Sequence, residues 1–172
     1  MIVPSILSGG GLDTSAAHLG EAEMRDVARE RYGLAGEFRR FDTEKDDTFR
    51  IRTASGEAYV LKIANPAEKP VEIDFQIDLL RHIEQRAPEV PVPRVLADHA
   101  GGFRSLYRAS DGTDRIVRVV SYLEGTPLDS TTSSPAERER VGEILARLRF
   151  ATADFRHPGE DRVLAWDVQH LM

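Results

Sequence analysis

The sequence contains no cysteine, only one tryptophan and only three methionines among its 172 residues. Without cysteine the chain has no disulfide framework, no thiolate zinc site and no cysteine nucleophile. It also lacks the run of 18 apolar residues that a membrane-spanning helix requires. Nor is there an excess of basic residues: 23 Lys and Arg against 29 Asp and Glu give a net charge of −6. This balance argues against nucleic acid as the main partner.

The composition that remains is typical of a globular protein, with 41% hydrophobic and 30% charged residues. The length indicates one domain and a fraction of another. Residues 1–7 are apolar but lack the basic region that begins a signal peptide. Together with the absence of cysteine, this favours a cytoplasmic location.

Hydrophobic periodicity and turn residues predict three helices and five strands. The helices are expected over 20–32, from Pro70 to about residue 84, and from Pro135 onward, where Ser134 can cap the first turn. Gly33 is a suitable C-terminal stop for the first helix. The strand-like segments lie at 36–41, 48–53, 58–63, 103–107 and 116–123.

The order of these elements predicts an α+β fold. Two hairpins separated by one helix do not fit a parallel, doubly wound sheet, so we expect a five-stranded antiparallel sheet with a helix packed on it. Four parts follow from this order: a flexible tail at 1–18, the main unit at 19–124, a linker at 125–134, and the beginning of a second unit at 135–172.

Lys62 is the first candidate for function, because it interrupts the hydrophobic strand Val60-Leu61-Lys62-Ile63. One interpretation is an edge lysine whose ammonium reaches water. The other is a phosphate-binding lysine held by a polar residue of the next helix. Glu72 and Gln76, four residues apart on one helix face, are the candidate partners.

Several segments in this order resemble the N-terminal lobe of the aminoglycoside phosphotransferase/choline kinase superfamily. They are the lysine strand, the helix that begins at Pro70, Val90-Pro91-Val92-Pro93-Arg94-Val95, and a strand end at 122–128. Segments 44–51 and 60–65 are most similar to its hydroxylysine kinase-like branch. The resemblance implies a protein-kinase-like fold, with ATP between an N-lobe sheet and a helical C-lobe. Residues 135–172 would then be the first part of a C-lobe that this chain does not complete.

The resemblance also implies roles for individual residues. Lys62 corresponds to the strand lysine that contacts the ATP phosphates. Gln76 stands where the family has the glutamate that orients this lysine, and Glu72, one turn earlier, can supply that charge instead. The phosphate-covering loop corresponds to Thr43–Thr48, which contains no glycine.

Four further residues correspond to the adenine site of the family. Val60 would cover the adenine ring and Val120 would form the back wall. The carbonyl of Ser121 and the amide of Leu123 would make the hydrogen bonds to adenine.

The catalytic centre of the family is missing from these residues. It needs a His-x-Asp loop, an Asn shortly after it, and an Asp-containing metal motif. His99 is preceded by Asp98 and lies in the wrong place, and His157 lacks the hydrophobic flanks and the later Asn. We therefore assign no catalytic residue and no metal ligand, and expect ATP and Mg²⁺ only in the complete protein.

Two hypotheses remain open. The first is the nucleotide-binding, N-terminal portion of an ATP-dependent phosphotransferase that acts on a hydroxyl of a small, amine-bearing substrate and is inactive alone. The second is a non-catalytic interaction or regulatory module, which could belong to a larger enzyme such as an aminotransferase fusion. The C-terminal segment carries apolar residues that this chain can cover only in part: Ile144, Leu148, Phe155, Val163, Leu164, Trp166 and Leu171. The segment should therefore fold back on its own sheet, pair with another copy or stay mobile, and of these we expect self-association.

Overall fold

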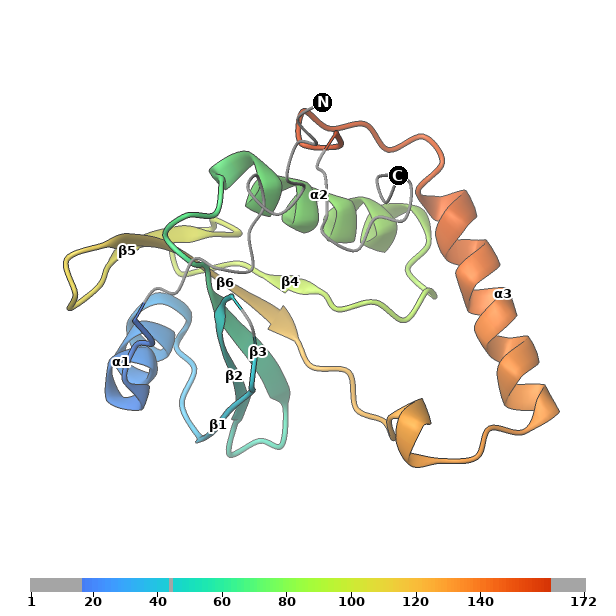
Figure 1. Ribbon diagram of the computed structural model, residues 1–172, viewed down its shortest axis with the longest axis horizontal. Coiled ribbons are helices and arrows are strands. Elements are labelled where there is room, and N and C mark those ends of the chain that lie inside the picture. The colour runs from blue at the N-terminus through green and yellow to red at the C-terminus, as the bar shows by residue number, and fades with distance from the viewer. Residues whose placement is uncertain (1–16, 44, 162–172) are drawn as a thin grey trace, which may run out of the picture.

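A computed structural model gives the fold and describes residues 17–43 and 45–161. The elements are α1 (Glu21–Tyr32), β1 (Glu37–Arg40), β2 (Asp47–Arg52), β3 (Ala58–Ile63), α2 (Pro70–Arg86), β4 (Val95–Leu96), β5 (Ser105–Arg108), β6 (Asp114–Ser121), the short 3-10 helix η2 (Leu128–Ser130) and α3 (Pro135–Ala151) (Figure 1).

Local sequence signals set the ends of the helices as predicted. Gly33 ends α1 in the left-handed conformation, with φ of 67°. α2 has Pro70 in its first turn and extends to Arg86, two residues beyond the predicted end. At the start of α3 the Ser134 side chain accepts a hydrogen bond from the Glu137 amide, and the Glu137 carboxylate accepts one from the Ser134 amide. This reciprocal pair is the capping box that favours helix initiation.

The strands form one antiparallel sheet in the order β1-β2-β3-β6-β4, and β5 also pairs with β6. The α+β, antiparallel prediction is therefore confirmed, but the sheet has six strands where the sequence predicted five. The extra strand, β4, follows Pro91 and Pro93, which lack the amide hydrogen that a ladder needs. Pairing therefore starts only after them: the Ser121 amide donates to the Arg94 carbonyl at 2.8 Å, and Val95 pairs with Val120.

The main core lies between α1 and one face of the sheet. The buried α1 residues Met24, Val27 and Ala28 belong to the same cluster as Phe49, Ile51, Leu61, Ile63, Val117 and Val119. These sheet residues alternate along β2, β3 and β6, so they project to one face. The residues between them, Lys62 and Arg118 among them, project to the opposite face.

α3 lies apart from the sheet and approaches the end of α2 (Figure 1). Leu148 and Ala151 pack there with Ile83, Ala87 and Val90. Phe155 packs edge-on against Phe75 of α2, with ring centroids 5.7 Å apart. Of the residues expected to be uncovered, Leu148 and Phe155 are thus partly covered by α2, whereas Val163, Leu164, Trp166 and Leu171 lie outside the described residues. Large apolar side chains are nevertheless exposed on α3: Val141, Leu145 and Phe150.

Of the tail predicted at 1–18, only Ala17 and His18 are within the described residues. Both are in contact with the sheet: the Ala17 carbonyl accepts from Arg115 at 2.9 Å, and His18 Nδ1 lies 2.9 Å from Asp47. Within the described part of the chain, no helix is both long and apolar enough to cross a membrane.

Candidate functional site

Strand register places four side chains on the face of the sheet opposite the main core. Lys62 of β3 is paired with Arg118 of β6, and Val60 is paired with Val120. Residues two apart in a strand project to the same side. The two cations and the two valines therefore share one face, with the cations nearer α2.

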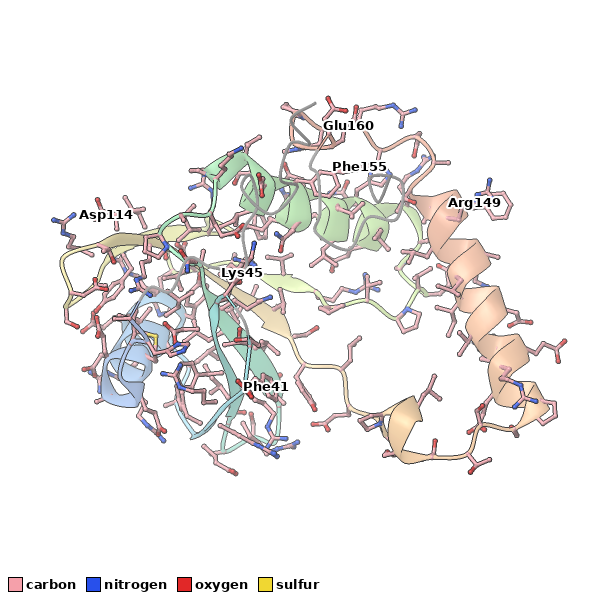
Figure 2. The ribbon with its side chains drawn as sticks, viewed as in Figure 1. Phe41, Lys45, Asp114, Arg149, Phe155 and Glu160 are labelled. Atoms are coloured by element: carbon pink, nitrogen blue, oxygen red, sulfur yellow. The ribbon has the colours of Figure 1, made fainter. Side chains whose placement is uncertain are left out.

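A cavity of about 480 Å³ opens beside the two cations, between this face of the sheet, α2 and the loop that precedes β2. Lys45, labelled in Figure 2, is one of its lining residues. The residues that line it are Asp42, Thr43, Lys45, Asp46, Thr48, Lys62, Glu68, Ile73, Gln76 and Arg118. Three of these side chains are acidic and three are basic, so the lining is formally neutral.

Asp46 is at the centre of the charges in this cavity. Its Oδ2 atom lies 3.2 Å from Arg118 Nη2 and 3.7 Å from Lys62 Nζ. The same Arg118 nitrogen donates to Gln76 Oε1 at 3.1 Å. Lys45 pairs with Glu68 at 3.4 Å. The cavity therefore holds two cations from adjacent strands at one carboxylate oxygen.

These surroundings weaken the charged form of the lysine. Burial, followed by repulsion from Arg118, holds the pKa of Lys62 below its ordinary value, although Asp46 opposes the shift. An additional anion at the cavity would favour the protonated lysine.

The structure brings together only some of the predicted phosphate-site residues. Lys62, Gln76, Thr43 and Thr48 line the cavity. Gln76, predicted to orient Lys62, instead accepts its hydrogen bond from Arg118, and the ion pair of Lys62 is with Asp46. Glu72 is half-buried in the first turn of α2, where Lys69 Nζ lies 3.9 Å from its carboxylate.

Of the four predicted adenine-site residues, Val60 and Val120 share the face of the sheet that carries Lys62, and Ser121 is the last residue of β6. Val60 is half-buried and Val120 is buried. The Ser121 hydroxyl accepts a hydrogen bond from the Arg94 amide at 2.8 Å. Leu123 follows the end of β6 and is exposed. Their contact with adenine stays a prediction.

Sequence reasoning missed Arg118 and the role of Asp46. A signal for Arg118 was present, because it interrupts the apolar run Ile116-Val117-Arg118-Val119 just as Lys62 interrupts its own strand. The significance of that charge depends on the register with Lys62. The sequence gives no signal for the position of Asp46, because its proximity to both cations depends on the tertiary fold.

The two histidines considered for catalysis, His99 and His157, make packing and polar contacts within the fold. The His99 ring lies beside Gly33, and the His99 amide donates to the Arg31 carbonyl at 2.9 Å. The His157 ring stacks on Phe155, and its Nε2 lies 3.5 Å from Asp78. Across residues 17–43 and 45–161, no three His, Asp or Glu side chains gather in a way that would hold a metal ion. The described residues thus form no cluster of ligands for Mg²⁺.

The antiparallel sheet, the helix α2 beside a strand lysine and the connection from β6 to α3 define the smaller lobe of a protein-kinase-like fold. The chain belongs to the phosphotransferase enzyme family, whose model matches residues 37–171. The superfamily expected from the sequence is thereby confirmed. Hydroxylysine kinases are among the relatives, in agreement with the expected branch.

Two relatives show the extent of the similarity. The chain is 29% identical over 150 residues to a hydroxylysine kinase of Danio rerio. The aligned region covers 84% of this chain and 42% of that protein. It is 30% identical over 149 residues to a homoserine kinase of Paraburkholderia phymatum, which covers 85% of this chain and 43% of that protein. The chain thus spans less than half the length of the relatives it matches.

Solved structures share the fold. An amicoumacin kinase, hAmiN, in complex with AMP-PNP, Ca²⁺ and Ami has a TM-score of 0.65 at 15% identity, covering 80% of this chain and 41% of that one. A microcompartment-associated aminopropanol kinase has a TM-score of 0.65 at 17% identity, covering 89% and 47%.

Proposed function

We propose that this chain is the nucleotide-binding portion of an ATP-dependent kinase that phosphorylates a hydroxyl of a small, amine-bearing molecule. The observation that carries the proposal is the position of Lys62, on the cavity and on the same sheet face as Val60 and Val120. A cation for phosphate and an apolar surface for a base are thereby adjacent. Family membership supports the reaction class.

The names of the relatives support the substrate class. Hydroxylysine, homoserine and aminopropanol each combine an amine with a hydroxyl group. In the complete protein, Lys62 would hold the ATP phosphates, and Mg²⁺ would supply charge neutralisation of the phosphates. The Ser121 carbonyl and the Leu123 amide would hydrogen-bond the base.

We infer that these 172 residues do not transfer phosphate by themselves. The sequence contains no His-x-Asp loop followed by an Asn, and positioning the acceptor hydroxyl depends on such a loop. The cytoplasmic location and self-association through α3 and the residues after it also stay predictions.

Binding of Mg·ATP, measured by calorimetry, tests the proposal. We expect binding at millimolar concentration or tighter, and its loss in Lys62→Ala. Lys69→Ala is the matched control, because the Lys69 side chain is 71% exposed, and it should bind as the unmodified chain does. Equal losses in both variants, or binding that ignores Lys62, would contradict the proposal.

A non-catalytic module is the second candidate. It is favoured by Gln76, which makes its hydrogen bond to Arg118 and carries no charge for Lys62. This alternative predicts no Mg·ATP binding at all, so the same titration separates the two functions.

A further inference from the structure

Two like charges face each other across adjacent strands at the cavity. Lys62 and Arg118 are direct register partners in β3 and β6. Like charges directly opposite in an antiparallel pair destabilise a sheet. Here both reach the same atom, Asp46 Oδ2, at 3.7 and 3.2 Å. The carboxylate oxygen therefore marks a position where two strands present positive charge to one acceptor.

We propose that Lys62 and Arg118 form a two-cation cradle for a phosphate group of the nucleotide, and that the Asp46 carboxylate occupies this cradle until phosphate displaces it. This inference rests on the proposed function and deepens it in two ways. It adds Arg118 as a second phosphate-binding residue, and it makes Asp46 an internal competitor for the nucleotide.

The surroundings of Arg118 suit this role. Its side chain is only 5% exposed and lines the cavity. Gln76 Oε1 accepts from Arg118 Nη2 at 3.1 Å, which orients the guanidinium. A glutamine is neutral, so it holds the arginine without cancelling its charge, whereas a glutamate would cancel it. Gln76 is thus a positioning residue for Arg118, which gives a physical reason for glutamine at this place.

Asp46 can leave the cradle by a side-chain movement. Its neighbour Asp47 is the first residue of β2 and points to the other face of the sheet, where the Leu19 amide donates to it at 3.1 Å. The Asp46 carbonyl accepts from the Thr43 hydroxyl at 2.5 Å, which holds the main chain in place. Rotation of the Asp46 side chain therefore moves this carboxylate away from both cations. A phosphate group brings more negative charge and more acceptor oxygens than the carboxylate it replaces.

The protonated form of Lys62 is also favoured by an anion in the cradle. Burial and the nearby Arg118 lower the pKa of Lys62, and Asp46 partly offsets this. A phosphate in the cradle would take over that compensation.

Titration with inorganic tripolyphosphate in the presence of EDTA tests the cradle without the base and without metal. We expect Asp46→Asn to bind tripolyphosphate at least about tenfold more tightly than the unmodified chain, because the competing charge is gone. Asp114→Asn removes the same charge from an exposed pair with Arg108 and should leave the affinity unchanged. If Asp46 instead positions Lys62 for phosphate, Asp46→Asn will bind more weakly, and the proposal is overturned.

The role of Arg118 is tested in the Asp46→Asn background. Adding Arg118→Gln should reduce tripolyphosphate affinity at least about tenfold, whereas adding Arg108→Gln should not change it. Since Arg118 is buried, Arg118→Lys serves as a second variant that keeps the charge, and it should retain part of the affinity. Tripolyphosphate binding that is indifferent to residue 118 would overturn its assignment.

Comparison with Mg·ATP separates this inference from the proposed function. One outcome is that the variants change tripolyphosphate binding as expected while ATP binds no more tightly than tripolyphosphate. In that case the cradle is supported and the nucleotide-binding function is contradicted. If Mg·ATP binds through Lys62 while Asp46 and Arg118 have no effect, the function stands and the cradle fails. Absence of tripolyphosphate binding in both the unmodified chain and Asp46→Asn overturns the cradle.

Discussion

The carboxylate of Asp47 and the guanidinium of Arg115 form an ion pair in which each side chain is only 2% exposed, with Arg115 Nη1 3.4 Å from Asp47 Oδ2. Arg40 also donates to Asp47, and the Leu19 amide donates at 3.1 Å. One carboxylate thereby joins the segment before α1 to β1, β2 and β6. The neighbouring Asp46 faces the cavity, so the same short segment serves both stability and the site.

Asp47→Asn should lower the free energy of unfolding by about 3 kcal/mol, because it removes the buried negative charge that Arg115 and Arg40 share and leaves Arg115 only its pair with Asp111, at 2.6 Å. Urea unfolding followed by circular dichroism measures this loss. Asp114→Asn, in an exposed pair, should cost less than about 1 kcal/mol. Equal costs for the two variants would show that burial of the pair does not matter.

Stability should fall at acid pH, and Asp47 should account for part of the fall. Burial opposes ionisation of Asp47, but hydrogen bonds from Arg40, the Leu19 amide and His18 outweigh it and lower its pKa. Hydrogen bonds from the Thr113 hydroxyl and amide lower the pKa of Asp111 to about 2. An aspartate with a lowered pKa stabilises the fold at pH values above its ordinary pKa of 3.8. This contribution is lost as the pH falls through the lowered pKa of the folded state.

Urea midpoints compared at about pH 7 and about pH 3 check this acid sensitivity. The unmodified chain should lose stability between the two, and Asp47→Asn should lose less. If Asp47→Asn loses as much stability between the two pH values as the unmodified chain, other carboxylates cause the acid sensitivity.

Nucleotide affinity should fall as the pH becomes alkaline. Burial and Arg118 lower the pKa of Lys62, so this lysine should lose its charge at a lower pH than an ordinary lysine, whose pKa is 10.5. Calorimetric titration of Mg·ATP at several values between about pH 7 and 10 measures the change. Lys62→Arg keeps its charge over this range, and its affinity should vary less. Parallel curves for the two proteins would rule out Lys62 as the titrating group.

Gly36→Ala should destabilise the fold by about 3 kcal/mol or more. Gly36 has φ of 151°, and an added Cβ would collide with the carbonyl oxygen of Arg52 on the neighbouring strand. Gly56→Ala is the control: its φ is 91°, but no atom lies within 4 Å of an added Cβ. The control should cost about 1–2 kcal/mol, from backbone strain alone. Thermal unfolding of both variants distinguishes collision from strain.

Local signals were sufficient to predict most elements of the fold. Helix ends are set by residues that act within one turn, so the sequence is enough to predict the effects of Gly33, Pro70 and Ser134. β4 escaped prediction because a two-residue strand has no periodicity of its own. It exists because β6 lies beside it, and its pairing with Val119 and Val120 is a tertiary contact.

The site divides in the same way. The sequence by itself determined that a lysine interrupts an apolar strand and that these 172 residues contain no His-x-Asp loop. Only the tertiary structure decided which charges meet. Arg118 is 56 positions from Lys62 (118 − 62 = 56), and strand register makes them neighbours at one oxygen of Asp46. Electrostatic interaction depends on distance and burial, and neither is set by position along the chain.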